Sequence, residues 1–219
     1  MRDHLISPIE ARVLGVLVEK QRTVPDTYPL SLNALVSGCN QKTSRDPVME
    51  VSDAQAQQAL DSLRSMNLVI ESSGGRVPRY SHNFERVLQV PAQSAALLAV
   101  LMLRGPQTAG ELRINCDRLH KFTDISSVEG FLHELAERPA GALVVELARQ
   151  PGSRENRWAH LLCGTPAPEQ QAASPPAAAP RRAENGELED LRARVEALEA
   201  GMAELKELMT KLRRMKDEG

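Results

Sequence analysis

The segment "LVIESSGGRVPRYSH" (residues 68–82) contains two short apolar runs on either side of a Ser-Ser-Gly-Gly stretch. Glycines between two such runs predict a tight turn that joins two antiparallel strands into a β-hairpin. A similar segment, "LVVELARQPGSRENRWAHLL" (143–162), begins about 75 residues later and predicts a second hairpin with a longer loop. The matching starts of the two segments, "LVIE" and "LVVE", indicate a structural repeat.

Three helices are predicted before each hairpin. Several helix starts are marked by a capping box, in which a Ser or Thr side chain accepts a hydrogen bond from the third helical N–H and a Glu or Gln at that position bonds back. The boxes are Ser7 with Glu10, Ser52 with Gln55, Thr108 with Glu111 and Ser126 with Glu129, while Ser31 caps a further helix without such a partner. Apolar residues behind these starts recur at helical spacing, which is typical of amphipathic helices.

Three helices followed by a hairpin, twice, is the order of elements in a winged helix-turn-helix domain. A three-helix bundle of this size buries too little surface alone, and a hairpin packed on it completes the core. The sequence therefore predicts a mainly α chain with small β-hairpin wings, made of two tandem winged helix-turn-helix domains at residues 1–88 and 89–163.

The C-terminal quarter of the chain divides into a linker and a helix. Residues 164–182 are rich in proline and alanine, so we expect a disordered linker. Residues 183–219 follow a heptad pattern that predicts a coiled-coil helix and a homodimer formed through it. The seam positions are Leu188, Leu191, Val195, Leu198, Met202, Leu205, Met209 and Leu212. The alternative is a helix that folds back onto the globular part.

Four stretches carry a resemblance to a known family: "SPIEARVLGVLVEKQRTVPDTYPLSLNALVSGCNQKTSRDPVM" (7–49), "LRGPQTAGELR" (103–113), "LARQPGSRENRWAHL" (147–161) and "LEDLRARVEALEAGMAELK" (188–206). The chain resembles the YceH-type family of bacterial proteins over nearly its whole length, apart from the proline- and alanine-rich linker. The resemblance implies two winged-helix domains in tandem. It implies no biochemical mechanism.

Composition narrows the classes of function. The formal net charge of −2 excludes a basic field over the whole surface but allows a local basic patch. Aromatic residues make up 3% of the chain, which argues against aromatic stacking platforms for single-stranded nucleic acid. The three cysteines are far apart and show no metal-ligand spacing, so we expect no metal and no cofactor. No signal sequence or membrane span is apparent, and we expect a cytoplasmic protein.

The polar segment "CNQKTSRDPV" (39–48) lies between two predicted helices and is the first candidate for binding. Its cations and hydroxyls are suited to positioning the phosphates of double-stranded DNA. Further candidates lie on the following helix and the first hairpin, where glutamines and arginines can reach bases and phosphates. The nucleic-acid-binding set is Lys42, Thr43, Ser44, Arg45, Gln55, Gln58, Arg76 and Arg79. The alternative is a plain turn in which Asn40 caps a helix end.

Two functions remain open. The first is a non-enzymatic DNA-binding protein, resembling a transcription regulator. The second is a scaffold for protein partners that uses the winged helices for docking without DNA, favoured by the acidic residues on the third helix of each domain. Catalytic residues are not predicted, because the histidines are scattered and no nucleophile or phosphate-cradling motif is present. Cys39 and Cys116 are expected to be packed as small apolar residues.

Overall fold

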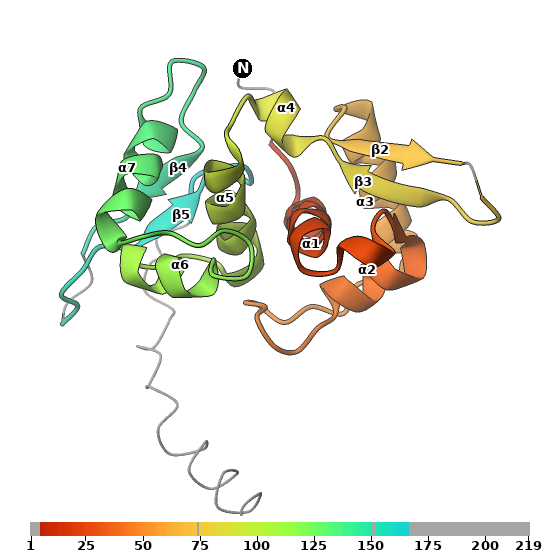
Figure 1. Ribbon diagram of the computed structural model, residues 1–219, viewed down its shortest axis with the longest axis horizontal. Coiled ribbons are helices and arrows are strands. Elements are labelled where there is room, and N and C mark those ends of the chain that lie inside the picture. The colour runs from red at the N-terminus through yellow and green to blue at the C-terminus, as the bar shows by residue number, and fades with distance from the viewer. Residues whose placement is uncertain (1–4, 74, 150–151, 167–219) are drawn as a thin grey trace, which may run out of the picture. The chain divides into compact units, whose positions relative to one another are not determined.

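The computed structural model describes residues 5–73, 75–149 and 152–166, and these form a mainly helical unit with small antiparallel sheets (Figure 1). Its first half contains α1 (Pro8–Thr23), the 3-10 helix η1 (Pro25–Thr27), β1 (Leu30–Ser31), α2 (Leu32–Cys39), α3 (Asp53–Ser65), β2 (Val69–Ser72) and β3 (Arg79–His82). Its second half contains α4 (Phe84–Leu88), α5 (Ala92–Arg104), α6 (Ala109–Asn115), α7 (Ile125–Ala136), β4 (Val144–Glu146) and β5 (Trp158–His160). Both predicted hairpins are confirmed.

The helix starts follow the predicted caps, with one exception. Complete capping boxes begin α1 at Ser7, α3 at Ser52 and α6 at Thr108, and Ser31 caps α2. The predicted box of Ser126 with Glu129 is wrong. Asp124 caps α7 instead, and its carboxylate accepts a hydrogen bond from the Ser127 N–H at 2.7 Å. Because Asp124 stands two residues earlier and is itself a strong cap, it sets the start of the helix.

The two halves share a sheet pattern as well as an order of elements. In the first half the strands lie in the order β1–β3–β2, and both pairs are antiparallel. In the second half β4 pairs with β5, and a single bridge between Gln107 and Trp158 takes the place of β1, the first strand. The backbones of Gln107 and Trp158 exchange two hydrogen bonds, of 3.0 and 2.7 Å. The second half is therefore a reduced copy of the first.

The core runs through both halves without interruption, and α1 and α5 pack against one another at its centre. Almost every residue in the middle of these two helices is buried, including the small residue Gly15. A Cβ atom at Gly15 would lie 3.0 Å from Leu103 Cγ and 3.3 Å from Met102 Cβ. Gly15 thus allows the close approach of α1 to α5, and this contact holds the two halves together.

The predicted coiled coil, with all eight of its seam residues, and most of the predicted linker lie outside the described residues. Within the described ranges, no helix is both long enough and apolar enough to cross a membrane.

Candidate functional site

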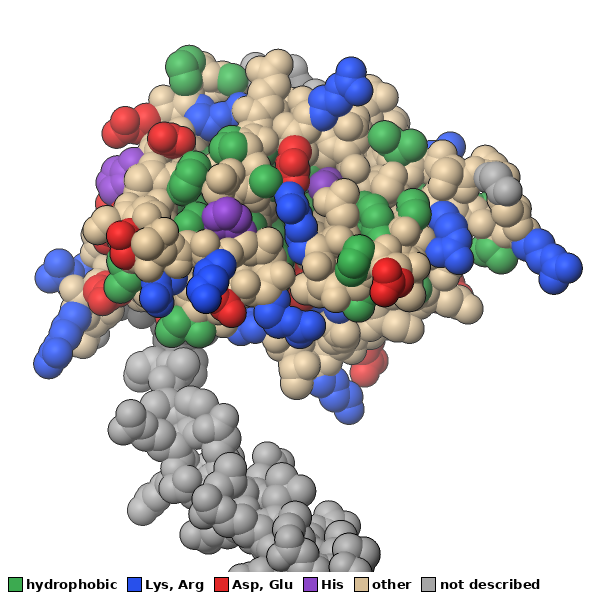
Figure 2. Space-filling model, in the orientation of Figure 1, with side chains coloured by type: hydrophobic (Ala, Val, Ile, Leu, Met, Phe, Trp, Pro, Cys, Tyr) green, Lys and Arg blue, Asp and Glu red, His purple; other side chains and the backbone are tan. Residues whose placement is uncertain are grey.

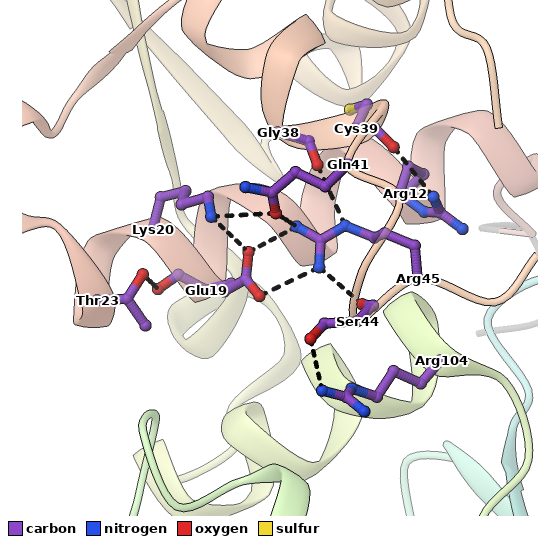
Figure 3. A network of polar contacts seen from close by, with 10 residues as sticks. All are labelled: Arg12, Glu19, Lys20, Thr23, Gly38, Cys39, Gln41, Ser44, Arg45 and Arg104. Atoms are coloured by element: carbon purple, nitrogen blue, oxygen red, sulfur yellow. Dashed lines mark hydrogen bonds and ion pairs between the residues drawn. The ribbon is translucent and has the colours of Figure 1, made fainter. Parts of the chain in front are cut away.

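The 40–48 loop connects α2 to α3 and is fixed by a network of polar contacts (Figure 3). Arg45 lies at the centre of this network. Its guanidinium forms two hydrogen bonds with the Glu19 carboxylate of α1, with N–O distances of 3.1 and 2.6 Å. It also donates to the Gly38 carbonyl at 3.1 Å and to Gln41 Oε1 at 2.8 Å. All of these contacts are made inside the protein.

Arg45 is therefore not a surface cation, and the prediction that it contacts DNA phosphate is wrong. Its side chain is 0% exposed, and the Glu19 side chain is 14% exposed. Burial alone would raise the pKa of the Glu19 carboxyl, but hydrogen bonds from Arg45 and the charges of Arg45 and Lys20 hold that pKa below its usual value. Glu19 consequently stays ionised, and Arg45 serves as its buried counter-ion.

Two further contacts shape the loop from within the first half. Arg12 of α1, which is 1% exposed, donates to the Cys39 carbonyl at 3.0 Å and to the Pro47 carbonyl at 2.6 Å. The Asn40 side chain forms two hydrogen bonds with the Val51 backbone, of 2.9 and 2.7 Å. Asn40 is also the C-cap residue of α2, so the capping role proposed as the alternative is confirmed. Hydrogen bonds from Arg12 and Asn40 thus hold the loop backbone in a defined conformation.

The loop is also bonded to α5 in the second half. The Asp46 N–H donates to the Leu103 carbonyl at 2.9 Å, and Arg104 donates to Ser44 Oγ at 2.7 Å. The predicted phosphate contact of Ser44 is thereby occupied by an internal partner. Arg45, Arg12 and these two bonds make the 40–48 loop a clamp between the halves, and we call this set of contacts the loop clamp.

The remaining predicted DNA contacts differ in their availability. Lys42 and Thr43 are exposed on the loop, Gln58 is exposed on α3 and Arg76 is exposed in the first hairpin. The other two are engaged: Gln55 completes the capping box of Ser52, and Arg79 donates to the Thr27 and Pro29 carbonyls at 3.3 and 2.7 Å. The exposed residues that remain candidates for DNA contact therefore come from the loop, α3 and the first hairpin.

The outer face of α3 carries charges of both signs. Arg64 pairs with Asp61 at 3.3 Å and with Glu71 of β2 at 2.7 Å. Figure 2 shows the same mixture over one whole face, with several Lys and Arg side chains recurring along the edge where the 40–48 loop and α6 lie. This surface is suited to a few local phosphate contacts rather than to a broad basic groove.

A cavity of about 340 Å³ adjoins the loop clamp, between the two halves. Its cationic lining comes from Lys20 on α1, Arg104 on α5 and Arg118 in the turn after α6. Sequence reasoning missed this group, because no local pattern connects three cations on segments so far apart in the chain. Within the described residues, no group of three His, Cys, Asp or Glu side chains is placed to hold a metal ion.

Comparison with known proteins places the chain in a family. A family model described as "Protein of unknown function, DUF480" matches residues 6–153, which include the loop clamp, the first hairpin and strand β4 of the second. The chain belongs to the DUF480 family. Its relatives include a UPF0502 protein of Dechloromonas aromatica (strain RCB), which is 63% identical over 206 residues, or 93% of this chain and 94% of the relative. A UPF0502 protein of Cupriavidus necator is 59% identical over 209 residues, covering 93% of this chain and 84% of the relative.

The resemblance to the YceH-type family is confirmed, since that label fits the DUF480 family of bacterial proteins. A UPF0502 protein of Delftia acidovorans, 59% identical over 203 residues, belongs to the same group and covers 90% of this chain. The DUF480 description assigns no activity, so a functional assignment depends on the geometry of the chain itself.

Cys39 and Cys116 are buried, as expected, and burial raises the pKa of each thiol to about 12.

Proposed function

We propose that this chain is a non-enzymatic DNA-binding protein composed of two tandem winged helix-turn-helix modules. The proposal is supported by the order α1–β1–α2–α3–β2–β3 and by the sheet order β1–β3–β2, which place a helix pair and a hairpin wing side by side. In winged helices the second helix of that pair faces the major groove, and the wing lies near the phosphates. The second half carries the same order with a single bridge in place of the first strand.

The observation that carries the proposal is the position of Lys42. Lys42 is exposed on the loop that leads into α3, while Arg45, three residues later, is buried and fixes that loop. A cation on a rigid loop loses little conformational freedom when it contacts a phosphate. Arg76, exposed in the first hairpin, supplies a second phosphate contact.

We expect binding with modest sequence preference. Gln58 is the exposed α3 side chain suited to an adenine edge, whereas Asp53 and Asp61 on the same helix repel phosphate. Phosphate contacts position a protein on the duplex, and base contacts specify the site. The module therefore depends on backbone contacts for most of its affinity.

The double variant Lys42→Ala/Arg76→Ala is expected to bind duplex DNA about tenfold more weakly at about 50 mM salt, because two phosphate contacts are lost. Fluorescence anisotropy with mixed-sequence duplexes measures the affinity. The matched control is Arg22→Ala/Arg86→Ala, which removes two exposed cations on α1 and α4, outside the proposed surface, and should change affinity less than twofold. Equal losses in the two double variants would contradict the assignment of Lys42 and Arg76.

We also propose that residues 183–219 pair two copies of the chain through the predicted heptad seam. A helix of this length with an apolar seam is marginal alone and gains stability from a partner. Removing residues 183–219 is expected to convert a dimer into a folded monomer of the remaining chain. Light scattering of both forms tests this, and a dimer that survives the truncation would place the interface elsewhere.

A protein-docking scaffold is the second candidate, and the first hairpin favours it. β2 is an outer strand of its sheet, so one of its edges is free of the strands in the described residues. Ile70 on β2 is 50% exposed and Val77 in the same hairpin is 54% exposed. An apolar free edge is suited to the addition of a strand from a partner protein. A stoichiometric protein partner that is lost in Ile70→Lys, together with absent DNA binding, would favour this function.

A further inference from the structure

The cavity between the two halves has the construction of a ligand site. The lining comes from the end of α1, the 40–48 loop, α5 and the end of α6 with the turn that follows it. Its apolar lining is formed by Val24, Val100, Leu103 and Leu119. Thr43, Ser44 and Asn115 add neutral hydrogen-bonding groups to the same cavity. Polar and charged residues make up most of the lining, and the apolar residues form one part of it, so a volume of about 340 Å³ is suited to a small polar molecule with a short apolar part.

The charges that line the cavity are unbalanced. Lys20, Arg104 and Arg118 are cationic, and Glu19 is the one acidic residue in the lining. Glu19 is already paired with Arg45 at 2.6 Å and with Lys20 at 3.0 Å. The Glu19 carboxylate is therefore already neutralised by two cations. Among the described residues, neither Arg104 nor Arg118 forms an ion pair with a carboxylate in this cavity.

The excess of positive charge affects the guanidinium of Arg104. Burial lowers the pKa of its guanidinium, and the positive charge of Arg45 lowers it further. Ser44 Oγ, a neutral acceptor, takes one of its hydrogen bonds at 2.7 Å. Arg104, Ser44 and Asn115 also line a second cavity of about 210 Å³, so these three residues lie where the two spaces meet. The second cavity is also lined by Asp46 and Glu111, so the excess of positive charge belongs to the first cavity, where an anion would balance it.

We propose that this cavity binds a small organic anion whose phosphate or carboxylate oxygens contact Arg104 and Arg118 and whose apolar part lies against Val100, Leu103 and Leu119. Because the cavity is lined by both halves, the bound anion bridges them and stabilises their packing through the loop clamp. The proposal does not depend on DNA binding. It makes the junction of the two halves a sensor for a small molecule.

The test uses the full-length chain with butyl phosphate, inorganic phosphate and citrate as probes and 1-butanol as the neutral control, all at constant ionic strength. Calorimetric titration is expected to show one butyl phosphate bound per chain and no binding of 1-butanol. At about 100 times the dissociation constant, butyl phosphate is expected to raise the unfolding temperature by several degrees, because it binds the folded state alone.

Arg118→Ala is expected to weaken butyl phosphate at least about tenfold, since a charge-assisted hydrogen bond is lost. Arg113→Ala is the matched control, because Arg113 is an exposed arginine on the adjoining α6 that does not line the cavity. It should change the affinity less than twofold. Arg118 is also exposed, so circular dichroism should show both variants folded.

Three outcomes would overturn the proposal. The first is that no probe binds at concentrations up to about 10 mM, the range of very weak sites. The second is an equal loss of affinity in Arg118→Ala and Arg113→Ala, which would indicate general attraction to surface charge. The third is a chain that binds duplex DNA through Arg118 and binds none of the small anions, which would assign the cations to backbone phosphate.

Discussion

Replacing Arg45 with alanine is expected to lower the free energy of unfolding by about 3–5 kcal/mol. The substitution removes the bidentate partner of Glu19 and leaves that largely buried carboxylate with Lys20 alone. It also leaves the Gly38 carbonyl without the guanidinium that bonds to it. Breaking a buried ion pair on one side is costly, because the remaining charge is poorly solvated. Urea denaturation followed by circular dichroism measures the loss.

Lys42→Ala is the matched control, since Lys42 is a cation three residues away on the same loop and is exposed. Surface substitutions of this kind usually change stability by less than about 0.5 kcal/mol. The pair Glu19→Gln and Arg45→Ala should be strongly non-additive, because both residues belong to one network. If Arg45→Ala and Lys42→Ala both lowered the free energy of unfolding by less than about 0.5 kcal/mol, the loop clamp would not hold the structure as described.

The second large effect is expected at the contact between α1 and α5. Gly15→Val places a branched side chain where even a Cβ atom would lie 3.0 and 3.1 Å from two Leu103 carbons. Overpacking of a closely packed core costs about 1–3 kcal/mol, and we expect Gly15→Val near the upper end because both helices must separate. Thermal or urea unfolding of the variant tests this.

Gly130→Ala provides the comparison at a second helical glycine. Gly130 is exposed on α7, and a Cβ atom there would have no atom within 4 Å. Alanine should therefore stabilise the protein by up to about 1 kcal/mol through helix propensity alone. A lower free energy of unfolding in Gly15→Val and a higher one in Gly130→Ala would support the close approach of α1 to α5. A stabilising Gly15→Val would show that this approach is looser than the structure has it.

Sequence patterns predicted the features of this fold that depend on neighbouring residues. The hairpins at 68–82 and 143–162 and the caps at Ser7, Ser52 and Thr108 arise from contacts within a few positions, so a local pattern carries them. The cap of α7 was predicted wrongly because two strong capping residues, Asp124 and Ser126, lie two positions apart and Asp124 takes the role. Strand β1 has two residues and was not predicted, because so short a strand has no measurable alternation.

The candidate site was predicted less well, because its contacts join distant segments. Arg45 and Lys42 are indistinguishable as polar loop residues, and only the pairing of Arg45 with Glu19, 26 positions away, separates their roles. The cations of the cavity depend on the packing of α1, α5 and α6. Such contacts follow from the tertiary structure rather than from any single stretch of sequence.

The most direct test of the proposed function is the salt dependence of duplex binding by the full-length chain. Fluorescence anisotropy at about 50 and 200 mM salt should show affinity that falls steeply, with a slope that becomes shallower by about 2 in Lys42→Ala/Arg76→Ala, because each lost phosphate contact changes the slope by about 1. Absence of binding at about 50 mM salt, or a slope that the double variant leaves unchanged, would contradict the account.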